Sequence, residues 1–120
     1  MNKFGATSLK RIKECHIDLQ TIAYELIKVM DVTILCGHRN EIDQNNAFIN
    51  GKSKLQWPQS KHNVLPSLAI DIAPYPIDWK NIDKFNEMCD HVERIAKDKG
   101  IKIRLGRDFS FKDYPHVEII

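Results

Sequence analysis

The spacing of apolar residues predicts two long amphipathic helices. The first follows Asp18, a suitable N-cap, and its apolar positions are Leu19, Ile22, Ala23, Leu26, Ile27 and Met30. The second ends at Gly100, a suitable C-cap, and its apolar positions are Ile82, Phe85, Met88, Cys89, Val92, Ile95 and Ala96. A short helical turn around Leu9 and Ile12 and a more polar helix from about Glu41 to Ile49 are also predicted.

Four shorter segments are typical of strands. They are rich in apolar and β-branched residues and comprise residues 32–36, 68–73, 101–105 and 116–120. The stretch from Gly51 to Ser67 contains two prolines and has little periodicity, so it is predicted as a long loop of the kind that usually serves function. The order of these elements indicates an α+β fold with a small, largely antiparallel sheet flanked by helices.

Length and composition favour one domain. The 120 residues, 42% of them hydrophobic, suffice for one sizeable core, so residues 1–120 are expected to form a single unit. Charges of both signs are mixed and the net charge is only +2, which argues against a nucleic-acid partner. No apolar run approaches the roughly 18 to 20 residues of a membrane span, and none follows the N-terminus as in a signal peptide. We therefore expect synthesis in the cytoplasm without membrane insertion.

The cysteines give little indication of function. Cys15, Cys36 and Cys89 are far apart and form no CxxC pair, so they predict neither a disulfide framework nor a thiolate zinc site. We expect buried free thiols. A nucleophilic pair of Cys36 and His38 is disfavoured, because nothing near Cys36 in the sequence would lower its pKa.

A metal site is the strongest chemical prediction. Asp71 interrupts an apolar strand, where a lone carboxylate is costly to bury, so it needs a cation, a donor network or a metal. An ion pair with a nearby Lys or Arg would satisfy Asp71 equally well if that residue is taken alone. Together with His62 and His116, however, it makes a set of two imidazoles and one carboxylate, which catalytic zinc uses with a fourth position left for water. Asp113, three residues before His116, is then a suitable general base.

These residues belong to a wider set of motifs. The motifs are Gly37-His38-Arg39 with Gln44, Gly51-Lys52-Ser53, Ser60-Lys61-His62, Ala69-Ile70-Asp71 and Asp113-Tyr114-Pro115-His116-Val117-Glu118. In this order they resemble the zinc D-alanyl-D-alanine carboxypeptidase and L-alanyl-D-glutamate endopeptidase family, especially its phage endolysin branch. The resemblance runs from about Phe4 to the C-terminus. It implies the Hedgehog/DD-peptidase type of fold and one catalytic domain without a separate wall-binding domain.

The resemblance also implies roles for single residues. The zinc ligands would be His62, Asp71 and His116, and the catalytic carboxylate would be Asp113. The residues matched to substrate-facing and accompanying polar positions are Arg39, Ser60 and Gln44. Glu118, on the same strand face as His116, is expected to orient that ligand from outside the metal shell. The interval between His62 and Asp71 is longer than is common in the family, and Gly106-Arg107-Asp108-Phe109 replaces a tryptophan-containing segment, so the substrate pocket is expected to differ.

The expected function is hydrolysis of the peptidoglycan stem peptide by zinc-activated water, at the bond between L-alanine and D-glutamate. Two alternatives stay open: a D,D-carboxypeptidase that removes terminal D-alanine, and a non-catalytic module that binds wall peptide. The endopeptidase is favoured because phage lysis requires the crosslinked net to be broken. We expect a monomer that reaches the wall after holin-type release.

Overall fold

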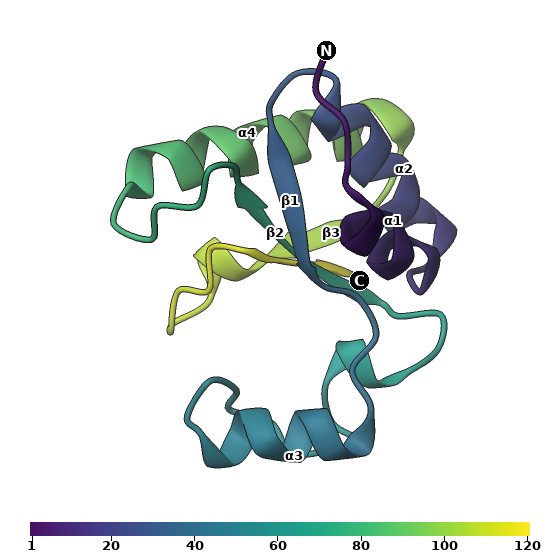
Figure 1. Cartoon of the computed structure of the whole chain (residues 1–120), viewed down its shortest axis with the longest axis vertical. Coiled ribbons are helices and arrows are strands. Elements are labelled where there is room, and N and C mark those ends of the chain that lie inside the picture. The colour runs from purple at the N-terminus through teal and green to yellow at the C-terminus, as the bar shows by residue number, and fades with distance from the viewer.

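The computed structural model describes residues 1–120 and consists of helices around one small sheet (Figure 1). The helices are α1 (Ala6–Lys13), α2 (Ile17–Ile27), α3 (Glu41–Ile49) and α4 (Ile82–Lys99). The strands are β1 (Val32–Cys36), β2 (Ala69–Pro74), β3 (Ile103–Leu105) and β4 (His116–Ile119), and two short 3-10 turns are η1 (Lys61–Asn63) and η2 (Gly106–Asp108). None of the helices combines the length and the apolar character that a bilayer span requires.

The sheet has the strand order β1-β2-β4-β3, and every neighbouring pair is antiparallel. This confirms the predicted α+β fold with a small antiparallel sheet. The two central strands, β2 and β4, are adjacent although about forty residues separate them in the chain. Their register sets Asp71 directly opposite His116, so two of the predicted ligands meet at the middle of the sheet.

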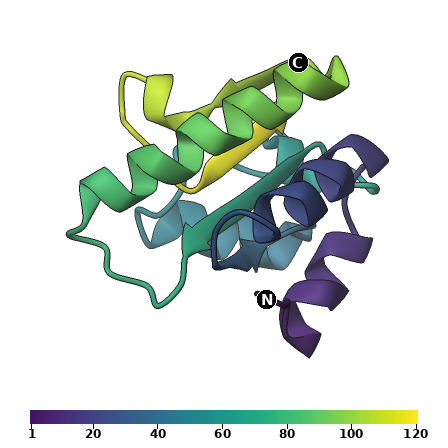
Figure 2. The same ribbon diagram turned by 90° about the horizontal axis from the view of Figure 1, so that it is seen from above.

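The apolar stripes of α2 and α4 pack together over one face of the sheet (Figure 2). Phe85 and Met88 of α4 and Ile72 of β2 are fully or almost fully buried in this core. Each such side chain contributes about 1.5 to 3 kcal/mol by leaving water. Gly100 ends α4 with a φ of 70°, in the left-handed conformation that its sequence position predicted. The core therefore fixes β2 and β4, which carry the candidate site on their other side.

Local interactions explain why the bounds of α1 and α2 differ from those predicted from the sequence. The helix α2 begins at Ile17, before the predicted N-cap, because His16 takes that position and its Nδ1 accepts a hydrogen bond from Asp18 N at 3.1 Å. The predicted turn near Leu9 is a helix of eight residues, α1. It covers the edge of β1, where Ser8 Oγ accepts from Ile34 N and Arg11 Nη1 donates to Ile34 O. An edge strand covered in this way is protected from pairing with another chain.

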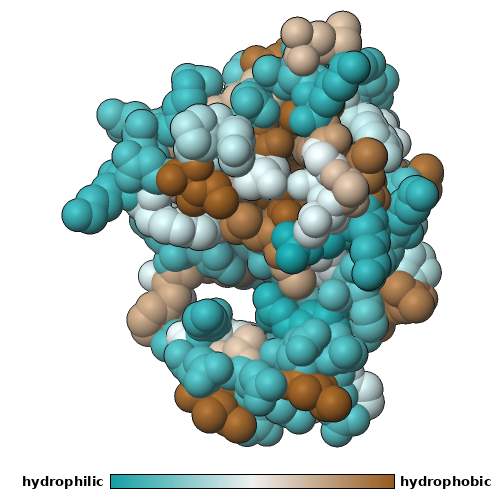
Figure 3. All heavy atoms as spheres, viewed as in Figure 1, coloured by the Kyte–Doolittle hydropathy of each residue, from teal (hydrophilic) through white to brown (hydrophobic).

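The helix α3 and the long loop after it form a lobe set apart from the sheet (Figure 1). The space-filling view shows an opening between this lobe and the rest of the molecule (Figure 3). At one place the two sides touch, since Lys54 Nζ lies 4.4 Å from the centroid of the Phe111 ring. Lys54 belongs to the long loop and Phe111 to the segment that leads into β4. This contact joins the long loop, which the sequence analysis predicted to serve function, to the segment just before the Asp113–Glu118 motif.

Candidate metal centre

Three predicted ligands converge from three different elements. Asp71 lies on β2, His116 on β4 and His62 in η1. Asp71 Oδ1 is 3.2 Å from His62 Nε2 and 3.2 Å from His116 Nδ1, and the two imidazole centroids are 5.3 Å apart. His62 is 2% exposed and His116 is 8% exposed, so the donors meet in a largely dry place.

The outer nitrogens of both imidazoles are held by acceptors. His62 Nδ1 is 2.7 Å from the carbonyl oxygen of Gly37, and His116 Nε2 is 2.8 Å from Glu118 Oε1. In a neutral ring these acceptors place the hydrogen on the outer nitrogen, which leaves a lone pair on His62 Nε2 and on His116 Nδ1 facing Asp71. Two lone pairs and a carboxylate oxygen at this spacing repel one another unless a proton or a cation lies between them. The donor set fits zinc, which is bound by such histidines with their outer N–H held by a carbonyl or carboxylate.

The electrostatics of the cluster show the same demand for positive charge. Burial by itself lowers the pKa of His62, but the charge of Asp71 and its hydrogen bond outweigh burial and raise the pKa to about 10. Burial likewise opposes the charge on Asp71, yet the two histidines hold its pKa well below the usual range. Without a metal, the site therefore keeps a proton that a bound cation would have to displace.

Asp113 lies beside this cluster, in the loop before β4. Its carboxylate forms, with Asp71 and His116, a group whose potential ligand atoms all lie within 4.8 Å of one another. The backbone fixes it, since Asp113 N donates to Gly106 O at 2.9 Å and Asp113 O accepts from His116 N at 3.0 Å. Asp113 is exposed overall, but partial burial of its carboxyl group raises the pKa of Asp113. The nearby negative charge of Asp71 raises this pKa further.

Arg39 borders the cluster from the side of the α3 lobe. Its Nη2 lies 3.7 Å from Asp71 Oδ2, and its Nη1 donates to Gln44 Oε1 at 3.0 Å. Its backbone N–H donates to the carbonyl oxygen of His62 at 2.8 Å. Arg39 is therefore a fixed positive charge next to the predicted ligands, held by one of them and by a buried amide.

Comparison with known proteins decides the family. A model of the phage L-alanyl-D-glutamate peptidase family matches residues 1–120. The chain belongs to this peptidase family. It is 34% identical, over 123 residues, to an L-alanyl-D-glutamate peptidase of Escherichia phage T5, and the match covers 98% of this chain and 88% of that protein. The crystal structure of the Serratia marcescens L-Ala D-Glu endopeptidase ChiX has the same fold, with a TM-score of 0.83 at 22% identity, over 99% of this chain and 91% of that one.

Two residues of this peptidase that were matched to accompanying polar positions, Gln44 and Ser60, lie in the protein interior. Gln44 is fully buried, and its Nε2 donates to Ser53 Oγ at 2.9 Å and to the Leu55 carbonyl oxygen at 2.6 Å. Ser60 is 8% exposed and caps η1, where its Oγ accepts from His62 N at 3.2 Å. In these positions Gln44 supports Arg39 and the long loop, and Ser60 supports the turn that carries His62.

Lys61, quoted only as part of the Ser60-Lys61-His62 motif, and Asn63, which no motif included, complete this support. Lys61 Nζ lies 3.2 Å from Glu118 Oε2, so Glu118 joins a lysine on one side to His116 on the other. Asn63 Nδ2 donates to Arg39 O at 3.0 Å and to Gln44 Oε1 at 3.1 Å. Their places next to His62 in the chain were the only signal that could have identified them.

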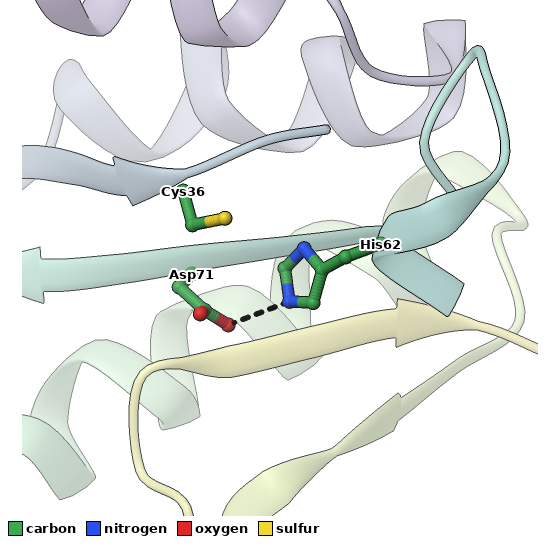
Figure 4. A group of neighbouring side chains, drawn as sticks. All are labelled: Cys36, His62 and Asp71. Carbon is green, nitrogen blue, oxygen red and sulfur yellow. Dashed lines mark hydrogen bonds and ion pairs between the residues drawn. The ribbon is translucent and has the colours of Figure 1, made fainter. Parts of the chain in front are cut away.

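Cys36 was also missed as part of this site. Its thiol forms with His62 and Asp71 a second group of potential ligand atoms within 4.8 Å of one another. Figure 4 shows the sulfur directed toward the His62 ring, above the Asp71 carboxylate. Cys36 is only partly buried, whereas Cys15 and Cys89 are buried as expected. The expectation of three buried thiols is therefore wrong for Cys36.

Proposed function

We propose that this chain is a zinc-dependent peptidase that hydrolyses the amide bond between L-alanine and D-glutamate in peptidoglycan stem peptides. The observation that carries the proposal is the convergence of His62 Nε2, His116 Nδ1 and Asp71 Oδ1, with both outer ring nitrogens held by acceptors. Such a set leaves room for a fourth, non-protein ligand. Zinc held there would supply a Lewis acid that activates water at neutral pH.

Asp113 is proposed as the general base. It accepts a proton from the attacking water and returns it to the nitrogen of the departing D-glutamate. The raised pKa of Asp113 makes its ionised form a better proton acceptor than an ordinary carboxylate. Its place on a backbone-fixed loop, beside Asp71 and His116 and still open to solvent, supports this role.

Arg39 is proposed to bind the substrate. A guanidinium pairs well with a carboxylate, and a D-glutamate residue carries one close to the scissile bond. Because Gln44 and Asp71 already hold the Arg39 side chain, it is preorganised for binding. We propose the opening between the α3 lobe and the rest of the molecule as the path by which an extended peptide reaches the site (Figure 3).

The product of digestion tests the proposal. Purified peptidoglycan incubated with the zinc-loaded protein should yield free peptides that begin with D-glutamate, and glycan strands that carry only L-alanine, as read by mass spectrometry. A chelator should abolish both products. Release of free D-alanine with stems still attached to sugar would support the carboxypeptidase instead. Binding to peptidoglycan without any cleavage would support the non-catalytic module. Action as a monomer after holin-type release is part of the proposal and stays a prediction.

A further inference from the structure

An irregularity in the sheet turns Cys36 toward the candidate metal centre. The strands β1 and β2 pair Ile34 with Ile72, but the next pair is Cys36 with Asp71, so Leu35 is an extra residue on β1. In a regular ladder, Cys36 would lie opposite Ile70 and share its core face. A β-bulge re-aims a side chain in this way and is frequent next to active sites. Cys36 therefore shares the face of Asp71 instead of the core.

The resulting cluster suits a soft metal ion. Cys36 offers a sulfur donor, His62 a ring nitrogen and Asp71 a carboxylate oxygen, and these three atoms lie within 4.8 Å of one another. A tetrahedral ion holds such donors about 3.3 to 3.8 Å apart, so the group can close on an ion by movements of about an ångström. Cys36 is partly exposed and, with Gly37, His38 and Arg39, lines a surface pocket of about 370 Å³.

We propose that Cys36, His62 and Asp71 form a second metal position, selective for thiophilic ions such as Cd²⁺, which competes with the zinc position because both use His62 and Asp71. A donor set that contains thiolate sulfur prefers soft ions more strongly than does the harder set that contains His116. When the ion binds, the Cys36 thiol releases its proton to solvent and the thiolate ligates the metal, which draws His62 and Asp71 away from His116. The inference shares donors with the proposed zinc site, but it does not require that the protein hydrolyse peptide.

The test follows Cd²⁺ binding to the metal-free protein without substrate. One equivalent of Cd²⁺ should produce a thiolate-to-metal charge-transfer band in the ultraviolet, and Cys36→Ser should lose it. Cys89→Ala, which removes a buried thiol next to the Tyr114 carbonyl oxygen, is the matched control and should keep the band. His116→Ala should also keep it, because His116 is absent from the proposed soft-metal set. Loss of the band in His116→Ala, or its survival in Cys36→Ser, would overturn the proposal.

A second measurement needs no substitution. Iodoacetamide should modify Cys36 in the metal-free wild-type protein, since it is the partly exposed thiol, and Cd²⁺ should protect it, as mapped by peptide mass spectrometry. An alkylation rate of Cys36 that Cd²⁺ leaves unchanged would contradict the inference even if Cys36→Ser failed to fold. Both readouts are independent of hydrolysis, so a failure of the proposed enzymatic function would be seen separately, as an absence of peptidoglycan products.

Discussion

At the scale of single residues, Asp71 is the centre of the site. One of its oxygens is 3.2 Å from each of two imidazole nitrogens, and its other oxygen is 3.7 Å from Arg39 Nη2. A mostly buried carboxylate needs such partners, because an unpaired buried charge costs several kcal/mol. The same partners make it a strong cation binder once the imidazoles are neutral.

Asp113→Asn separates catalysis from metal binding. The amide has the same shape but cannot accept the proton, so the rate should fall by about 10² to 10⁴-fold while zinc content and Tm stay unchanged. Metal analysis and product release measure the two effects. Asp83→Asn, an exposed change in the first turn of α4, is the control and should leave both unchanged. If zinc is lost instead, Asp113 is a ligand, as its closeness to Asp71 and His116 would allow.

Glu118→Gln should weaken zinc binding without removing a ligand. The amide oxygen can still accept a hydrogen bond from His116 Nε2, but the negative charge that makes the His116 imidazole a stronger metal ligand is lost. Lys61 Nζ also loses its carboxylate partner at 3.2 Å. Outer partners of this kind are worth about 10 to 100-fold in metal affinity. Competition with a zinc-binding dye measures the change. Glu87→Gln, an exposed partner of Lys84, should have wild-type affinity; an equal loss there would argue against a specific role of Glu118.

At the scale of elements, η2 packs through Gly106 against the segment that carries Asp113 and His116. A Cβ at this position would lie 2.8 Å from His116 Cβ and even closer to the Asp113 carbonyl oxygen. The absence of a side chain lets η2 pack directly against the loop before β4. The positions of Asp113 and His116 therefore depend on a residue that takes no part in the chemistry.

Gly106→Ala should consequently disturb the positions of both Asp113 and His116. The backbone must move to admit the methyl group, which should cost about 1 to 3 kcal/mol of stability, as overpacking usually does. Activity should fall more than the loss of folded protein explains. Thermal unfolding and the specific rate at a temperature well below Tm measure the two effects. Gly5→Ala is the control, because no atom lies within 4 Å of its added Cβ. Unchanged activity in Gly106→Ala would show that the segment can shift without harm.

At the scale of the whole molecule, the candidate site joins the α3 lobe, which lies outside the hydrophobic core, to the sheet. His62 is on η1, within the long loop of the α3 lobe, whereas Asp71 and His116 are on the sheet. A metal bound to His62, Asp71 and His116 would connect the lobe to the sheet. The three ligands come together only in the folded protein, so the metal would bind the folded state and not the unfolded chain. Ligands that bind only the folded state stabilise it by about 4 kcal/mol at a concentration 1,000 times Kd.

Zinc should therefore raise Tm, and the rise should shrink as the pH falls from about 8 to about 6, because protons compete for His62 and His116. In the metal-free protein the raised pKa of His62 gives stability the opposite pH dependence, because stability decreases as the pH rises. Its ion pair with Asp71 stabilises the fold fully below the pKa of an unfolded histidine and is lost as the pH rises toward about 10. Thermal scans with and without a chelator at each pH measure the difference. A zinc-induced shift independent of pH would contradict histidine ligation.

Local patterns in the sequence determined the elements. The apolar repeats of α2 and α4, the β-branched run of β1 and the polar helix α3 needed only short-range periodicity, because a helix or strand exposes one face at a fixed period. Residue chemistry went further, since a carboxylate in an apolar strand and two histidines in family motifs pointed to one metal. The bounds of α2 escaped prediction because His16 caps it with a ring nitrogen, an uncommon N-cap.

Only the tertiary structure decided which side chains reach the site. Gln44 was predicted as an accompanying polar position on a polar helix, and its burial became visible only in the structure, where the long loop folds over it. Cys36 read as the end of a buried strand, but the bulge opposite Asp71 turned its sulfur toward His62. Both outcomes depend on strand register and on contacts between distant segments. Sequence periodicity specifies the faces of an element by itself, whereas the partner of each face is settled when the elements pack.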